Sequence, residues 1–175
     1  PLLTAMSSLP FTAFSREVRR NIWILKSLPI DGFVAARAKI RGSMLMILPG
    51  GLPVAVALEW MLGFPATGFL AGLAMGAMAS YLICCVGVCL DLARPMLDWV
   101  SQEKAIKSNL NTILGLVMGF GAIVAAALGI AGLFRLGLPA FGVALIVGVI
   151  LAVLAFLAGR LLPGTAERLW AKLET

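Results

Sequence analysis

Four long apolar runs, almost free of charge, constrain what this chain can fold into. They cover about residues 43–62, 66–90, 110–134 and 138–162. Each run reaches the roughly 20 helical residues that cross the hydrocarbon layer of a bilayer. Spanning backbone must bond within the protein, as a helix or a closed barrel, and the runs lack the two-residue alternation of barrel strands. We therefore predict an all-α, polytopic membrane protein with a single transmembrane domain over residues 1–175.

The charged residues lie between these runs and are distributed unevenly. Lys and Arg number seven in residues 15–41, three in 91–109 and three after residue 159, and alternating spans place all of these on one side. The opposite side has only Arg135. Because Lys and Arg mark cytoplasmic segments, we expect a multi-pass protein of the cytoplasmic membrane with its C-terminus in the cytoplasm. The net charge of +6 then predicts contact with anionic membrane lipids and not with nucleic acid.

Two elements are expected before the first span. Residues 1–14 begin with Pro1, show no signal-peptide pattern, and are expected to be the end of a preceding helix. Phe11, Phe14 and Val18 then recur at helical spacing, which predicts an amphipathic helix over residues 15–30 at the cytoplasmic surface. This helix could rest on anionic lipid or dock a cytoplasmic partner. Its charged residues include Arg16, Glu17, Arg20 and Lys26.

Proline and small residues mark the spans themselves. Pro49 and Pro53, with two glycines between them, predict a bent or broken first span, either as a hinge or as a packing kink. Small residues at a spacing of four let another helix approach closely. They predict a packing face, within the chain or against a second subunit, formed by Gly68, Gly72 and Gly76 with Ser80, and by Gly115 and Gly119.

The sequence predicts no metal site. The three cysteines, Cys84, Cys85 and Cys89, lie in one span, and the chain has no histidine. They lack distant partners for a disulfide framework and a fourth ligand for zinc, so we expect reduced thiols that fill space. Trp60 and Trp170 are expected to be anchors at the membrane interface.

The charged segments at residues 15–41 and 91–111 contain a shared set of residues: Ser15, Arg16, Glu17, residues 24–30, Lys39, Asp91, Pro95, Leu97, Trp99, Ala105, Lys107, Asn109 and Asn111. With these residues, the two segments resemble the membrane subunit of type-2 ABC exporters. Arg19 and Arg20 depart from this pattern, since a glycine or a lone lysine is expected there. The resemblance implies that the chain runs from the end of the second helix to the last helix of a six-helix unit.

The same resemblance implies that ATP hydrolysis and transport are carried out by different subunits. A separate cytoplasmic ABC ATPase would bind and hydrolyse ATP, and a second permease copy or half would complete the path. No G-x-x-x-x-G-K-[ST] loop is present to cradle phosphates, so no enzymatic activity and no bound cofactor are expected in this chain. The residues expected to couple to the ATPase are Arg16, Glu17, Arg20 and Lys26. A second cytoplasmic contact is expected in the mixed-charge segment 91–111, at Asp98, Trp99, Lys104 and Lys107.

Two other functions are compatible with parts of the sequence. A non-transporting membrane scaffold or lipid-binding protein would also use a basic helix and apolar spans. Residues 31–37 resemble the start of the CDP-alcohol phosphotransferase signature, but Arg37 stands one position late. The next aspartate after Asp31 is Asp91, so the clustered carboxylates that hold metal ions in such enzymes are missing. The transported substrate is not indicated.

Overall fold

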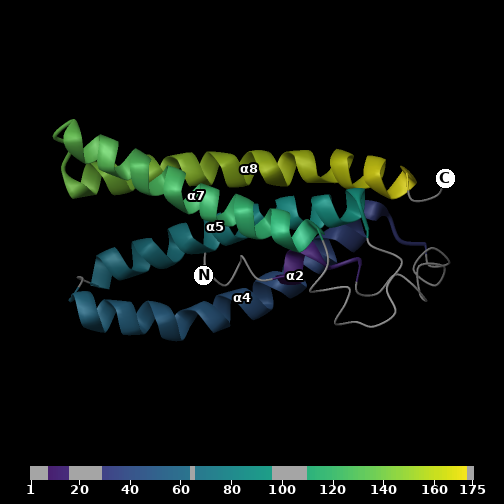
Figure 1. Cartoon of the computed structure of the whole chain (residues 1–175), viewed down its shortest axis with the longest axis horizontal. Coiled ribbons are helices and arrows are strands. Elements are labelled where there is room, and N and C mark those ends of the chain that lie inside the picture. The colour runs from purple at the N-terminus through teal and green to yellow at the C-terminus, as the bar shows by residue number, and fades with distance from the viewer. Residues whose placement is uncertain (1–7, 16–28, 64–65, 96–109, 173–175) are drawn as a thin grey trace.

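The protein is a bundle of helices (Figure 1). The computed structural model describes residues 8–15, 29–63, 66–95 and 110–172, and it contains no strand within these ranges. Four helices are long and apolar enough to cross a membrane, which confirms the all-α fold with four spans. The expected amphipathic helix falls mainly on residues 16–28, which lie outside the described residues. The helices are α2 (Ser8–Phe11), α4 (Gly32–Leu62), α5 (Ala66–Ala93), α7 (Leu110–Arg135) and α8 (Ala140–Lys172).

The four long helices form two hairpins whose turns lie at the same end of the molecule (Figure 1). Gly63 follows α4 with φ 62°, and Gly137 follows α7 with φ 79°. Glycine reaches this region without the penalty that a Cβ imposes. We call this end the turn end. The opposite end, where α4 begins and α8 stops, is called the charged end and carries Arg37, Lys39, Arg41, Arg94, Arg168 and Lys172.

The buried core lies towards the charged end. There α4, α5 and α8 pack against one another. At Gly32 an added Cβ would lie 2.4 Å from Cβ of Trp170, so the start of α4 is in direct contact with the end of α8. The core residues are Phe14, Ala35, Ala36, Ile40, Ile47, Cys84, Cys85, Val88, Leu92, Leu162, Ala166 and Trp170.

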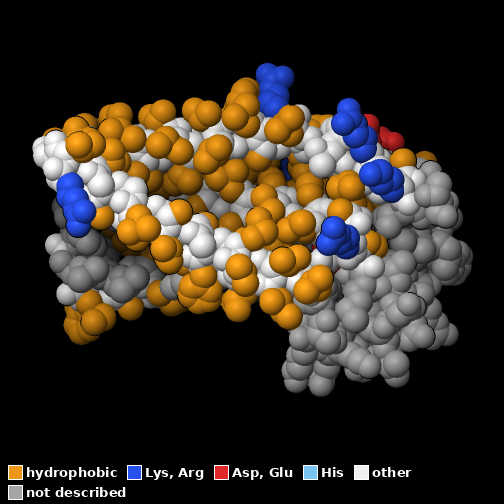
Figure 2. All heavy atoms as spheres, turned by 45° about the horizontal axis from the view of Figure 1, so that its top comes forward, with side chains coloured by type: hydrophobic (Ala, Val, Ile, Leu, Met, Phe, Trp, Pro, Cys, Tyr) orange, Lys and Arg blue, Asp and Glu red, His pale blue; other side chains and the backbone are white. Residues whose placement is uncertain are grey.

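Outside this core, little of each span is buried within the chain. Only 11% of the apolar window of α7 and 6% of that of α8 are buried within the chain. Figure 2 shows apolar side chains over most of one face, with Lys and Arg side chains gathered mainly towards one end. A surface this apolar needs lipid or another protein around it, as expected of a multi-pass membrane protein.

Helix α4 differs from the predicted first span in two respects. It begins at Gly32, not near residue 43, and its first turn is closed by the Ala35 amide, which donates to the Asp31 carbonyl at 3.1 Å. Hydropathy detects only the apolar part of this helix, because charged residues occupy its exposed face. Of the two alternatives predicted for Pro49 and Pro53, a break is wrong, since the helix continues through both prolines, and a bend stays a prediction. A spanning helix tolerates the few freed backbone groups.

Helix α8 also extends beyond its predicted span. The fourth apolar run ends at residue 162, but the helix continues through Pro163 to Lys172. Leu162, Ala166 and Trp170 recur every four residues and are all buried, so this last part has an apolar face of its own. Trp170 packs near Phe14, with ring centroids 6.1 Å apart, and is therefore a core residue and not an interface anchor.

Candidate functional site

A fully buried carboxylate, Asp91, lies near the end of α5. Its side chain is 0% exposed, and burying such a group requires hydrogen-bond donors. The amides of Phe14 and Ser15 donate to Oδ2 at 2.6 and 3.0 Å. The Ser15 hydroxyl donates to Oδ1. Asp91 therefore fixes the end of the segment 8–15 to α5.

Asn111 connects the same carboxylate to α7. Its Nδ2 donates to Oδ1 of Asp91 at 3.3 Å and to the Arg94 carbonyl at 3.0 Å. The last carbonyls of a helix lack partners within the helix, so the second bond satisfies an acceptor just beyond α5. We call this group the Asp91 node: Phe14, Ser15, Asp91, Arg94 and Asn111. It joins three segments that are distant in sequence.

Apolar contacts fix residues 8–15, which we call the N-terminal wedge, beside the node. Phe11 is 1% exposed and lies against α7, where a Cβ added to Gly115 would be 2.6 Å from its ring. Pro10 lies against α5, where a Cβ added to Gly87 would be 3.0 Å from Cβ of Pro10. Glycine at both positions allows the wedge to fit between the two helices.

The residues predicted to couple to an ATPase lie next to the node in sequence. Both predicted contact groups lie outside the described residues: Arg16, Glu17, Arg20 and Lys26, and Asp98, Trp99, Lys104 and Lys107. The first group begins with the residue that follows Ser15. The second belongs to the segment that joins Pro95 to Leu110, one residue before Asn111. Both predicted contact segments are therefore attached to residues of the node or their immediate neighbours.

The glycines predicted to form packing faces have different surroundings. Gly115 and Gly119 on α7 are buried, whereas Gly68 and Gly72 on α5 are exposed and Gly76 is half-buried. A Cβ added at Gly72 would meet nothing within 4 Å. The close approach of another segment to α5 occurs at Gly87, which the spacing-of-four pattern did not include.

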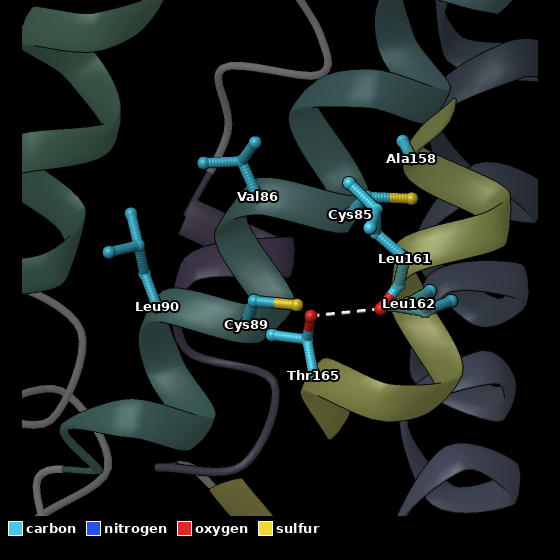
Figure 3. A pocket seen from close by; sticks show the side chains of 8 residues that line it. All are labelled: Cys85, Val86, Cys89, Leu90, Ala158, Leu161, Leu162 and Thr165. Carbon is cyan, nitrogen blue, oxygen red and sulfur yellow. Dashed lines mark hydrogen bonds between the residues drawn. The ribbon is translucent and has the colours of Figure 1, made fainter. Parts of the chain in front are cut away.

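An apolar groove of about 310 Å³ lies between α5 and α8. Figure 3 shows its lining side chains projecting from these two helices. Its one hydroxyl, on Thr165, donates to the Leu161 carbonyl at 2.8 Å and so is satisfied by its own helix. The groove is lined by Cys85, Val86, Cys89, Leu90, Ala158, Leu161, Leu162 and Thr165.

The chemistry available in the described part of the chain is limited. Cys84, Cys85 and Cys89 are free thiols. The described residues contain no group of three or more His, Cys, Asp or Glu side chains that could hold a metal ion. Asp31 is exposed at the start of α4, and the Arg37 guanidinium stands 5.8 Å from the centroid of the Phe33 ring on the same helix.

Comparisons of the chain with known protein families, curated proteins and solved structures found no match. The resemblance to ABC exporter permeases therefore leads to a proposal about function and not to membership of a family.

Sequence reasoning missed the meeting of Ser15 with Asp91. In the sequence, Ser15 and Asp91 stand out only among the residues that carry the resemblance to ABC exporter permeases. One signal was present, because Asp91 and Asn111 stand at facing ends of two consecutive spans, where a polar pair can meet. Nothing in the sequence indicated that Ser15 would bond the same carboxylate.

Proposed function

We propose that this chain is the membrane-spanning permease subunit of an ATP-driven ABC exporter, with its charged end in the cytoplasm. It would move a substrate across the cytoplasmic membrane, and a separate subunit would hydrolyse ATP. The observation that supports this proposal best is the Asp91 node, which ties the start of the predicted coupling segment to two spanning helices.

A permease without an ATPase of its own must receive movement from a partner. A conformational change needs two arrangements whose balance the partner alters, and a contact segment that is loosely attached would transmit little of that change. Here the coupling segment begins immediately after Ser15, which bonds Asp91 through both its amide and its hydroxyl. A displacement of this segment would therefore act directly on α5 and, through Asn111, on α7.

The second predicted contact fits the same arrangement. Residues 96–109 join Pro95 to the start of α7, so an ATPase that touched both segments would act on both sides of one hydrogen-bond network. Such networks hold their members in one arrangement when all bonds are satisfied. This would give the partner one mechanical connection to two spans.

A membrane scaffold or lipid-binding protein is the main competing function. The exposed apolar faces of α7 and α8 and the basic charged end suit it equally well. The two functions differ in one respect that can be measured: only the permease requires a stable complex with an ABC ATPase. A CDP-alcohol phosphotransferase is a third possibility, and it predicts activity on a CDP-linked lipid.

The test is purification of the tagged full chain from its native membrane. We expect a protein with the G-x-x-x-x-G-K-[ST] loop of an ABC ATPase to co-purify in a fixed ratio, and reconstituted vesicles containing both to hydrolyse ATP. A triple variant at the predicted contact, Arg16→Ala, Glu17→Ala and Arg20→Ala, should lose the ATPase.

A matched control removes the same set of charges at exposed positions of the same end. It combines Arg37→Ala, Arg41→Ala and Glu167→Ala, and it should keep the ATPase. Absence of an ABC ATPase from the wild-type preparation would refute the permease function. Equal retention by both triple variants would refute the assigned contact.

A further inference from the structure

Helix α4 has an inner part, residues 32–51, and an outer part, residues 52–62, that pack differently. The inner part has buried residues along one face at steps of three and four: Ala36, Ile40, Ser43, Ile47 and Gly51. Beyond Gly51 the described side chains are exposed or partly exposed, and Trp60 is 88% exposed. In Figure 1 the two hairpins lie together at the charged end and spread apart towards the turn end. The outer part can therefore move without disturbing the buried core.

Two prolines lie at the boundary between these parts. A proline in a helix has no amide hydrogen and cannot donate to the carbonyl four residues before it. The helical bonds from Pro49 to the Leu45 carbonyl and from Pro53 to the Pro49 carbonyl therefore cannot form. The helix is continuous through both prolines, but it is held by fewer backbone bonds here than elsewhere, and sharp kinks in helices occur mainly at such positions.

The missing bonds determine the direction in which α4 can bend. Successive helical residues are offset by about 100°, so Pro49 lies about 200° around the helix from both Ile47 and Gly51, on the opposite face. Pro49 and Pro53 are accordingly exposed. Widening the helix on this exposed face breaks neither of the two bonds, since neither exists. Widening it on the bundle face would break the helical bond from Gly51 to Ile47. A bend therefore carries the outer part towards the bundle.

We propose that α4 bends at residues 49–53, so that the turn end of the α4–α5 hairpin moves towards α7 and α8 while the charged end stays fixed. The start of α5 follows because the link at Gly63 is short, and residues 66–72 are exposed or partly exposed. The charged end stays in place because the core and the Asp91 node hold it. The hinge is a property of this chain alone, whereas a role for it in opening the outer side of a transport path rests on the exporter function proposed above.

The movement is large enough to measure with spin labels. A sharp kink exceeds about 20°, and Trp60 lies about 14 Å beyond Gly51 at 1.5 Å per residue, so such a kink moves it by about 5 Å. The experiment uses the full chain in lipid nanodiscs, with its three cysteines replaced by alanine. Pulsed electron–electron double resonance gives the distance distribution between labels on the two hairpins. The outer pair of labels is at Trp60 and at Phe141, which is 79% exposed, and the inner pair is at the exposed residues Ala38 and Leu161.

We expect the outer pair to show two distances, or one distribution broader than that of the inner pair, by about 5 Å or more. Pro49→Ala with Pro53→Ala restores both amide donors and should narrow the outer distribution to the width of the inner one. Pro163→Ala is the matched control. It restores a donor within α8, near the charged end, and should leave both distributions unchanged.

The hinge is refuted by any of three results. An outer pair as narrow as the inner pair in the wild type would exclude the movement. A broad outer distribution that persists without Pro49 and Pro53 would mean that the hairpin tilts as a whole. Equal narrowing by Pro163→Ala would indicate a general effect of removing proline. Because Pro49 and Pro53 are exposed, their replacement leaves the core intact, which a narrow inner pair confirms. No ATPase is present, so these outcomes are independent of the co-purification that tests the exporter function.

Discussion

Replacing Asp91 should release the N-terminal wedge from the bundle. Asp91→Ala removes the acceptor for the amides of Phe14 and Ser15, the Ser15 hydroxyl and one bond of Asn111. Leaving one buried donor unmatched costs about 1–3 kcal/mol. The costs do not add fully, because the vacated space lets some of these groups find other partners. We therefore expect about 3–4 kcal/mol of lost local stability, which is roughly two to three orders of magnitude in the opening equilibrium.

Asp91→Asn should cost much less, because it conserves the shape and most of the bonds. The amide oxygen can take the place of Oδ2 and accept from both backbone amides. The amide nitrogen then faces the Ser15 hydroxyl, which can turn and accept. Only the bond from Asn111 meets a second donor and is lost. We expect about 1–1.5 kcal/mol, or about tenfold.

Hydrogen–deuterium exchange measures this local opening directly. The peptide that contains Phe14 and Ser15 should exchange faster by the factors above, in the order wild type, Asp91→Asn, Asp91→Ala. Glu167→Gln, at an exposed carboxylate on α8, should change exchange by less than about twofold. Equal effects of the Asn and Ala variants, or no effect of either, would refute the role assigned to the node.

Three further predictions follow from close contacts and from charge. Gly115→Ala places a Cβ 2.6 Å from the Phe11 ring and should lower the free energy of unfolding by about 1–3 kcal/mol. Gly121→Ala on the same helix meets nothing within 4 Å and should be neutral or slightly stabilising. Equal thermal shifts of the two variants would contradict the packing of Phe11 against α7. Gly32→Ala places a Cβ 2.4 Å from Cβ of Trp170 and should lower the midpoint of thermal unfolding, whereas Gly42→Ala has open space and should not. In a cysteine-free background, cysteines at Gly63 and Gly137 should react with a membrane-impermeant maleimide from outside the cell and one at Ser101 should not, because Lys and Arg mark the cytoplasmic side; the reverse pattern would invert the proposed orientation.

The span pattern could be predicted because lipid imposes a strict rule on sequence. A helix in hydrocarbon must be apolar for about 20 residues, so the four runs were visible, and the turns at Gly63 and Gly137 fell between them. The start of α4 was not visible. Arg37, Lys39 and Arg41 suit a helix in water as well as a loop, and tertiary contact at Gly32 and Ala36 decides the matter.

The candidate site was less predictable, because it depends on contacts between distant segments. Asp91 and Ser15 are 76 residues apart, and no spacing rule connects them. The packing of Trp170 against Gly32 depends on the length of α8, which hydropathy underestimated at Pro163. The small-residue pattern gave Gly115 and Gly119 but not Gly87, because what approaches Gly87 is the short wedge and not another long helix.

The length of α8 has a consequence for how the molecule is held together. Its 33 residues extend about 50 Å, against a hydrocarbon layer of roughly 30 Å, so its charged last turns stand in water. The packed residues around Trp170 and Gly32 are therefore stabilised by exclusion of water. Spans within lipid lack this hydrophobic driving force, because lipid is as apolar as they are, and they depend on close packing and hydrogen bonds instead. The contact between the two hairpins at the charged end should therefore behave like the core of a soluble protein. Urea should separate the two hairpins there, while each hairpin stays inserted in the membrane.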